Sequence, residues 1–302
     1  MSGSTRTAVI INPISGTGGR PDAARQRAER AAALLAARGV DAEIFVTERG
    51  GHARDLAAAM ITRGVSLIVA WGGDGTVNEV ASALAFTTAR LAVIPSGSGN
   101  GLARELGIPL DPAAAFTCAV DGQTRLIDCG ELDGRLFFNI AGLGLDARVA
   151  HEFAAHGLVR RGFARYIEVA VRELFTYEAH DHTIVADGQV QHSRALIVAL
   201  ANARQYGNGA LIAPHARIDD GKLDVVVVDA RPLWQTLLQV PKLFNGTIGT
   251  AAGVTMRAAA TVEITSSKPV VYHIDGEPFV GGASLVARAH AQALHVQVPA
   301  TR

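Results

Sequence analysis

Glycines, an aspartate and small polar side chains gather in short stretches of the N-terminal third, each directly after an apolar run. Residues 72–79 read Gly-Gly-Asp-Gly-Thr-Val-Asn-Glu and follow the apolar residues 66–70. Glycines at a strand-to-helix turn let backbone N–H groups approach an anion, and the helix N-terminus adds partial positive charge. The stretch is therefore typical of phosphate binding. A tight turn with Asp74 as N-cap is the alternative for one such stretch alone.

Two further stretches have the same character. Residues 12–19 read Asn-Pro-Ile-Ser-Gly-Thr-Gly-Gly, and residues 95–101 read Pro-Ser-Gly-Ser-Gly-Asn-Gly. In an open α/β sheet, ligands bind beyond the carboxyl ends of the strands, where all three turns are expected. Neither a Walker A loop nor a dinucleotide Gly-x-Gly-x-x-Gly follows these strands, so the expected phosphate cradle is of another type.

The elements that would hold these turns alternate between strand and helix signals. Predicted strands cover residues 8–12, 42–47, 66–71 and 90–95. Predicted helices between them include residues 22–38 and 52–63. This alternation predicts βαβ units and a mostly parallel sheet covered by helices.

From about residue 130 onward, strand signals follow one another without crossover helices. They cover residues 136–141, 183–186, 195–201, 223–228, 261–266 and 270–274. Helical insertions are expected near residues 147–175 and 232–243. Such a pattern predicts an antiparallel sandwich or barrel.

Composition limits the class of protein. The chain has 302 residues, 49% of them hydrophobic and 19% charged, which predicts a folded protein of two domains. The 28 basic and 28 acidic residues balance, which argues against a nucleic-acid partner. Cys118 and Cys129 have neither metal-site nor redox-pair spacing, so we expect buried thiols in a reducing compartment. Without a signal peptide or an apolar run of about 18 residues, we expect a cytoplasmic protein with no transmembrane span.

Together these stretches resemble the diacylglycerol kinase catalytic-domain family, which includes bacterial lipid kinases and the sphingosine kinases. Further matching segments follow in the same order, at residues 138–147, 205–209, 219–224 and 275–277. The Gly-Gly-Asp-Gly turn alone is shared with NAD kinases and phosphofructokinases. Asn78 and Glu79 directly after that turn, with the two flanking stretches, favour the lipid kinases.

The resemblance implies a fold of two parts, α/β plus all-β. The first is a Rossmann-like nucleotide domain of the NAD kinase and phosphofructokinase type, and the second is a C-terminal antiparallel β-sandwich. We expect the ATP-binding catalytic domain over residues 1–130 and the lipid-substrate domain over residues 131–289. In the family a last strand returns to the first domain, and we expect this of residues 290–302.

The resemblance also implies the reaction. An ATP- and Mg²⁺-dependent lipid kinase would transfer the γ-phosphoryl group to a hydroxyl of diacylglycerol or a sphingoid-type lipid. The lipid would come from the membrane surface, with the protein peripheral at the inner membrane; homodimerisation is left open. The alternatives are a catalytically silent nucleotide- or lipid-binding regulator and an NAD-kinase-like kinase of a soluble hydroxyl compound.

By resemblance, nucleotide-binding residues are spread over the three turns and two further positions. They are Asn12, Pro13, Ser15, Gly16, Thr47, Gly72, Gly73, Asp74, Gly75, Thr76, Asn78, Glu79, Ser98 and Glu277. Ser98 stands where the family has a nucleotide-contacting Thr and keeps the hydroxyl. Thr47 is equally consistent with an ordinary strand-end residue. Gly101 stands where the family often has Asp, which leaves the acceptor lipid harder to name.

The same resemblance makes Asp275 the candidate general base, which would take the proton of the acceptor hydroxyl. Spacing alone favours a different interpretation, an Asp-Gly hairpin turn. Asp74 is the rival carboxylate, and beside a base at Asp275 it would orient phosphate or Mg²⁺. A second magnesium site is implied at the Asp220 carboxylate with the backbone carbonyls of Arg217 and Lys222. A plain turn before the next strand is the alternative there.

Basic residues add two further hypotheses. Arg20, after the first glycine stretch, either meets a phosphate or is a solvated helix-start residue. Arg160, Arg161 and Arg165 lie among apolar residues, so this segment either rests on an anionic membrane or is a solvated helix face.

Overall fold

The computed structural model describes residues 6–16, 22–155 and 163–300 of the chain. These form two compact units, unit 1 being Met1–Ile127 with Gln292–Arg302 and unit 2 being Asp128–Ala291. Arg20, Arg160 and Arg161 lie outside the described residues, as does the side chain of Arg165. Within the described ranges, no helix combines the length and apolar character needed to cross a bilayer.

Unit 1 is built on a parallel sheet of buried apolar strands. Its strands are β1 (Thr7–Ile11), β2 (Ala42–Val46), β3 (Leu67–Gly72) and β4 (Arg90–Pro95), in the order β2-β1-β3-β4. The end of β15 (Ser284–Val298) adds a further parallel neighbour to β4. All residues of β1 and β3 are buried, as expected for a sheet covered on both faces.

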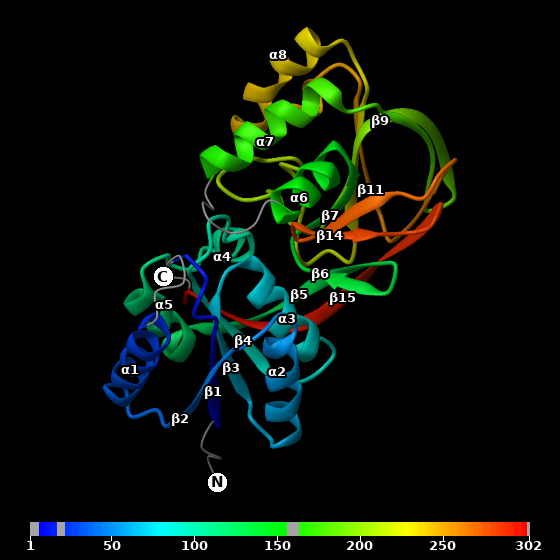
Figure 1. Cartoon of the computed structure of the whole chain (residues 1–302). Helices are drawn as coiled ribbons and strands as arrows, with labels where there is room; N and C mark the ends of the chain where they lie inside the picture. The colour runs from blue at the N-terminus through cyan, green and yellow to red at the C-terminus, as the bar shows by residue number, and fades with distance from the viewer. Residues whose placement is uncertain (1–5, 17–21, 156–162, 301–302) are drawn as a thin grey trace. The chain divides into compact units, whose positions relative to one another are not determined.

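Helices cover both faces of this sheet (Figure 1). On one face lie α1 (Ala23–Ala36) and α5 (Pro112–Asp121), and on the other lie α2 (His52–Thr62) and α3 (Asp74–Leu84). Helix α3 buries Val77, Val80, Ala81 and Leu84, a stripe at helical spacing. A short helix, α4 (Gly101–Glu105), follows the third glycine-rich stretch. The predicted α/β fold is confirmed.

Unit 2 consists mainly of antiparallel strands. They are β5 (Gln123–Leu132, which begins in unit 1), β6 (Arg135–Phe137), β7 (Ile140–Gly144), β8 (His180–Ala186), β9 (Gln189–Ala201), β10 (Leu223–Asp229), β11 (Val254–Ala259), β12 (Thr261–Ser266), β13 (Val271–Ile274) and β14 (Glu277–Val280). Neighbours run in the order β14-β13-β7-β9-β8-β12-β15, and β10 pairs with both β9 and β11.

Two apolar cores hold unit 2 together. The first fills the interior of the sandwich with residues such as Leu143, Val198 and Ile264. The second packs α6 (Leu145–Ala155) and α7 (Phe163–Thr176) against strand residues such as Ala199 and Val226. Helix α8 (Leu233–Phe244) and a 3-10 turn (Ile248–Thr250) follow β10 (Figure 1). The predicted β-sandwich is confirmed.

One expected strand is wrong in detail. Residues 136–141 form the end of β6 and the start of β7, with Phe138 and Asn139 in a turn between them. The backbone N–H groups of Phe138, Asn139 and Ile140 are bonded to the carboxylate of Asp275, so they are not available to a continuous ladder.

The two thiols are buried, as expected, and form no disulfide; the Cys118 thiol donates to the Gln297 carbonyl at 3.9 Å. Burial raises the pKa of Cys118. Burial, with the nearby carboxylates of Asp128 and Glu131, raises the pKa of Cys129 to about 12. Both thiols are therefore protonated and inert at neutral pH.

Candidate active site

The three glycine-rich turns of unit 1 pack directly against one another at the carboxyl ends of β1, β3 and β4. A Cβ on Gly97 would lie 2.7 Å from the Cα of Gly73, and a Cβ on Gly16 would lie 2.2 Å from the Ser96 carbonyl oxygen. Gly16 also has a positive φ of 70°. Because no side chain fits at these contacts, the glycines allow backbone to approach backbone. The expected convergence of the turns is present within this unit.

Asp74 joins the second turn to the third. Its Oδ2 accepts a hydrogen bond from the N–H of Asn100 at 2.9 Å, and its Oδ1 accepts one from the N–H of Gly101 at 2.7 Å. Asn100 has a positive φ of 50°, and its side chain bonds both the N–H and the carbonyl of Gly97 at 2.8 Å. The third turn is thus held by one carboxylate from outside and one amide from within.

Side chains of the first turn complete this arrangement. The Asn12 amide donates to the Thr76 hydroxyl at 2.8 Å, and the hydroxyls of Ser15 and Ser96 are 2.8 Å apart. Thr76 and Ser15 are both buried. Every one of the three turns is therefore bonded to another by polar side chains as well as by backbone contact.

Arg27 is a residue of this site that the sequence did not reveal. It lies on α1, is 8% exposed, and donates to the Asn12 carbonyl, to the Ser15 hydroxyl at 2.9 Å and to the Ser15 carbonyl. Its guanidinium carbon lies 5.7 Å from the centre of the Trp71 ring. Burial lowers the pKa of Arg27. Among the described residues, no carboxylate forms an ion pair with it, so a positive charge lies directly beneath the first turn.

The other predicted nucleotide residues have varied surroundings. Glu79 caps the N-terminus of α2, accepting from the N–H groups of Gly51 at 2.8 Å and Ala53 at 3.0 Å. The structure places the remaining predicted residues as follows: Pro13 after β1, Thr47 after β2, Gly72 and Gly73 at the end of β3, Gly75 and Asn78 in α3, exposed Ser98 in the third turn, and exposed Glu277 at the start of β14 in unit 2.

In unit 2, Asp275 occupies a two-residue hairpin turn. Asp275 and Gly276 have φ values of 47° and 87° and connect β13 to β14. The carboxylate accepts three backbone N–H groups, from Phe138 at 3.0 Å, Asn139 at 2.9 Å and Ile140 at 3.0 Å. The hairpin interpretation of this Asp-Gly pair is thus what the backbone shows, and a catalytic role is compatible with it.

The same device occurs elsewhere in unit 2. Asp187 and Gly188 form a hairpin turn with φ values of 46° and 81°, and the Asp187 carboxylate accepts the N–H groups of Ala260 and Thr261. These backbone hydrogen bonds lower the pKa of Asp187. Geometry of the turn alone therefore does not distinguish a catalytic aspartate from a structural one.

A buried polar network beneath the turn sets Asp275 apart. His273, 3% exposed, accepts the Gly276 N–H at Nδ1 (3.3 Å) and contacts Asp146 Oδ2 through Nε2 (3.2 Å). The Tyr206 hydroxyl donates to the same Asp146 oxygen at 2.9 Å. This pattern assigns the His273 proton to Nε2. The sequence offered one signal for these three residues, since each lies in or beside a segment that carries the family resemblance.

The predicted magnesium residues lie in a turn before β10. Asp220 Oδ1 accepts the Lys222 N–H at 3.1 Å, and the buried Asp128 accepts the Gly221 N–H at 2.6 Å. Burial, followed by the nearby charge of Asp220, raises the pKa of Asp224. Carboxylates thus crowd this turn, a setting that suits a hard cation. No group of three or more His, Cys, Asp or Glu side chains with metal-binding geometry occurs in the described ranges.

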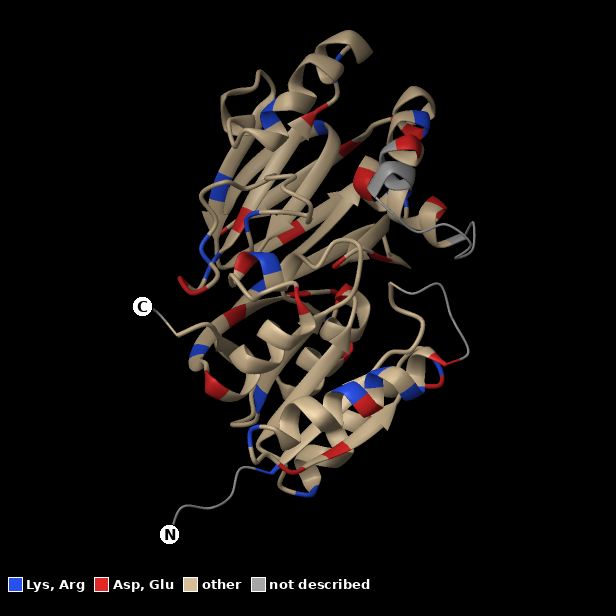
Figure 2. Cartoon of the chain, turned by 90° about the vertical axis from the view of Figure 1, so that its left-hand side faces the viewer, with Lys and Arg blue, Asp and Glu red and all other residues tan. Residues whose placement is uncertain are grey.

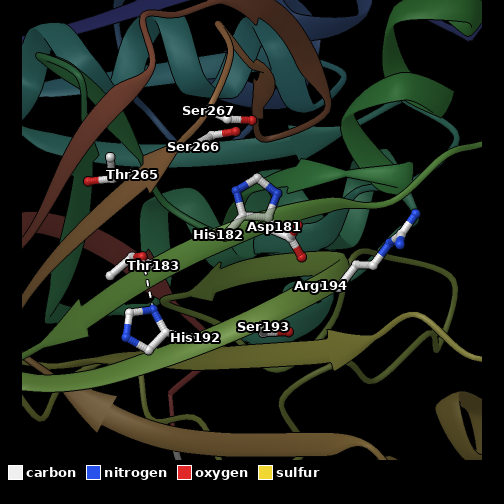
Figure 3. A pocket seen from close by; sticks show the side chains of 9 residues that line it. All are labelled: Asp181, His182, Thr183, His192, Ser193, Arg194, Thr265, Ser266 and Ser267. Carbon is white, nitrogen blue, oxygen red and sulfur yellow. Dashed lines mark hydrogen bonds between the residues drawn. The ribbon is translucent and has the colours of Figure 1, made fainter.

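A separate pocket of about 570 Å³ lies in unit 2 over β8, β9 and the end of β12 (Figure 3). Its lining includes His182, His192 and Ser266, and none of the predicted site residues. The Thr183 hydroxyl and His192 Nδ1 are 3.1 Å apart, as the dashed line shows. Burial lowers the pKa of His182.

Two family models match this chain, one over its N-terminal part and one over its C-terminal part. Residues 6–132 match the family model described as diacylglycerol kinase catalytic domain. Residues 139–298 match the model described as YegS C-terminal NAD kinase beta sandwich-like domain.

Relatives of similar length match nearly the whole sequence. A probable lipid kinase YegS-like from Pseudomonas aeruginosa is 33% identical over 272 residues, covering 87% of this chain and 86% of the relative. A diacylglycerol kinase from Mycobacterium tuberculosis is 33% identical over 279 residues, covering 90% of this chain and 88% of the relative.

Solved structures show the same fold. A putative diacylglycerol kinase from Bacillus anthracis has a TM-score of 0.78 at 23% identity and covers 97% of both chains. An NAD kinase from Archaeoglobus fulgidus in complex with ATP has a TM-score of 0.50 at 12% identity. These findings confirm the resemblance read from the motifs. The chain belongs to the diacylglycerol kinase catalytic-domain family of lipid kinases and is a phosphotransferase with an alcohol group as acceptor.

Proposed function

We propose that this kinase transfers the γ-phosphoryl group of Mg²⁺-ATP to a hydroxyl of a membrane-derived lipid, either diacylglycerol or a sphingoid base. The relatives named lipid kinase and diacylglycerol kinase support a lipid acceptor. In the reaction, the acceptor oxygen forms a bond to the γ-phosphorus while the bond from that phosphorus to the β,γ-bridging oxygen breaks. ADP leaves with the electron pair of the broken bond.

The observation that carries the proposal is the backbone-to-backbone packing of three glycine-rich turns at one sheet edge. Phosphoryl transfer needs little covalent chemistry from the protein, and depends on positioning and on stabilising charge. The turns would offer backbone N–H groups to the triphosphate, and the N-terminus of α3 would add partial positive charge. Arg27 beneath the first turn adds a full positive charge, which favours an anion there.

Asp275 is the proposed general base. Three N–H donors hold its carboxylate in one orientation, and a carboxylate held in this way can accept a hydroxyl hydrogen.

Magnesium is proposed at two places. Bound Mg²⁺ supplies charge neutralisation for the phosphates, and the Asp74 and Glu277 carboxylates are the proposed ligands or orienting groups near the nucleotide. The second, structural site would use the Asp220 carboxylate with the carbonyls of Arg217 and Lys222.

The test is ATP turnover over a panel of diacylglycerol, monoacylglycerol, sphingosine, ceramide and phosphatidylglycerol. Asp275→Asn should lose at least about 100-fold in turnover, the usual scale for a general base. The matched control is Asp187→Asn, which makes the same change in the same kind of turn and should keep wild-type turnover. Thermal unfolding of both variants separates loss of chemistry from loss of fold.

Each other outcome changes the conclusion. Equal turnover by Asp275→Asn and wild type would remove Asp275 from the mechanism. Phosphorylation of NAD⁺ without any lipid would indicate a soluble acceptor. ATP binding without turnover on every acceptor would indicate a regulator.

A further inference from the structure

Helix α8 presents its apolar residues to solvent. Trp234 is 63% exposed, Leu238 is 70% exposed, and Leu237 and Phe244 are 42% and 44% exposed. The helix has no buried residue over its twelve positions. Leu237 and Leu238 lie three and four positions after Trp234, and Phe244 lies seven positions after Leu237, so all four share one stripe along the helix. Ordinary surface helices turn such a stripe inward.

The opposite side of α8 is the side that contacts the protein. The Gln239 amide donates to the Ala252 carbonyl at 3.0 Å, and Lys242 Nζ donates to the carbonyl and hydroxyl of Thr250 at 3.3 and 3.1 Å. Leu243 packs on the second core of unit 2, and its carbonyl accepts the Leu211 N–H at 2.7 Å. These contacts fix the helix with its apolar stripe outward.

The charge around α8 indicates what covers the stripe. Residues 230–262 contain no Asp or Glu and include Arg231, Lys242 and Arg257. In Figure 2 the turns of α8 accordingly carry no red. An apolar stripe with basic neighbours and a tryptophan is the composition of segments that lie in the interface of an anionic bilayer.

We propose that the outward face of α8, formed by Trp234, Leu237, Leu238 and Phe244, docks on a lipid bilayer that contains anionic headgroups. This inference rests on the proposed function, because a lipid kinase must reach acceptors held in a membrane. The side chains enter the boundary between headgroups and acyl chains, while Arg231, which is exposed just before the helix, attracts the headgroups.

Intrinsic fluorescence and co-sedimentation test the docking directly. The chain has two tryptophans, of which Trp71 is 3% exposed and Trp234 is 63% exposed, so a spectral change reports Trp234. Adding vesicles of phosphatidylcholine and phosphatidylglycerol should shift the emission to the blue and sediment the protein. Leu238→Glu should weaken vesicle binding at least about 10-fold. The substitution removes an apolar side chain that the bilayer would bury, and it adds a negative charge that the anionic headgroups repel.

The matched control is Val190→Glu, which places the same charge at a 59% exposed apolar residue of β9. It should bind vesicles as wild type does. Equal vesicle binding by Leu238→Glu and Val190→Glu would overturn the proposal. A wild-type dimer that Leu238→Glu turns into a monomer, with vesicle binding unchanged, would also overturn it and assign the stripe to a second copy of the chain.

Turnover separates this inference from the proposed function. On a water-soluble short-chain diacylglycerol without vesicles, Leu238→Glu should match wild type. On vesicle-held diacylglycerol it should lose at least about 10-fold. If wild type phosphorylates neither form of diacylglycerol, diacylglycerol is removed as the acceptor in the proposed function, and the vesicle-binding measurement still decides whether α8 docks.

Discussion

The two candidate regions of this kinase are built in different ways. In unit 1 the three glycine-rich turns meet through glycine backbone, with Gly97 against Gly73 and Gly16 against Ser96. In unit 2 the Asp275 turn is held by buried side chains, with His273 on Asp146 beneath it. The first region is therefore sensitive to added volume, and the second to lost hydrogen bonds. Both regions contain segments that carry the family resemblance. In unit 1 these segments supply the close backbone contacts, and in unit 2 they supply the hydrogen-bonded side chains.

The largest effect of a substitution is expected in unit 2, where side chains hold the Asp275 turn. His273→Ala should lower the free energy of unfolding by about 3 kcal/mol, because it leaves the buried Asp146 with fewer partners and opens a cavity. Chemical denaturation followed by circular dichroism measures this loss. The control is His192→Ala, an exposed histidine in the same unit, which should change the unfolding free energy by less than about 0.5 kcal/mol. A loss at His273 as small as that would mean that Asp146 is satisfied without it.

A smaller effect is expected from the backbone-built region. Gly97→Ala should cost about 2 kcal/mol of stability and weaken ATP binding, because its Cβ meets the Gly73 Cα at 2.7 Å. Gly75→Ala is the matched control, since nothing lies within 4 Å of its Cβ and alanine favours the helix. It should leave stability unchanged or raise it by up to about 1 kcal/mol. The same loss at both glycines would contradict the backbone-contact account.

The smallest effect is expected at Arg27, whose long side chain contacts the backbone of the first turn. Arg27→Lys should weaken ATP binding about 10-fold, since one ammonium group cannot reach both backbone oxygens that the planar guanidinium contacts. Titration calorimetry with ATP measures the change. Arg30→Lys, on the exposed side of the same helix, should bind ATP as wild type does. Unchanged binding by Arg27→Lys would limit Arg27 to a packing role.

The sequence predicted the backbone-built region well because its signals are local. Apolar runs of strand length, followed at once by glycines, placed the turns of unit 1 at strand ends, and sheet topology brought them together. Arg27 was not predicted as a site residue, because it lies within helix α1 and an arginine in a helix usually faces solvent. Its burial depends on the turn it supports, which no local pattern encodes.

The side-chain-built region was less accessible to sequence. The partners of Asp275 lie about 135 residues earlier, so hydrogen bonding to Phe138, Asn139 and Ile140 could not be read from spacing. The same bonds explain why a single strand expected over residues 136–141 is two. Similarly, α8 was expected as a helix, but the outward direction of its apolar stripe depends on the contacts of Gln239 and Lys242.

The burial of both native thiols allows an introduced cysteine to be labelled selectively. Cys118 and Cys129 stay protonated at neutral pH, so maleimide reagents should leave the native chain unlabelled. A single reporter introduced by Leu238→Cys would then be the reactive position, with no native cysteine to remove. A spin label or an environment-sensitive dye attached there would measure insertion depth on the otherwise unmodified enzyme.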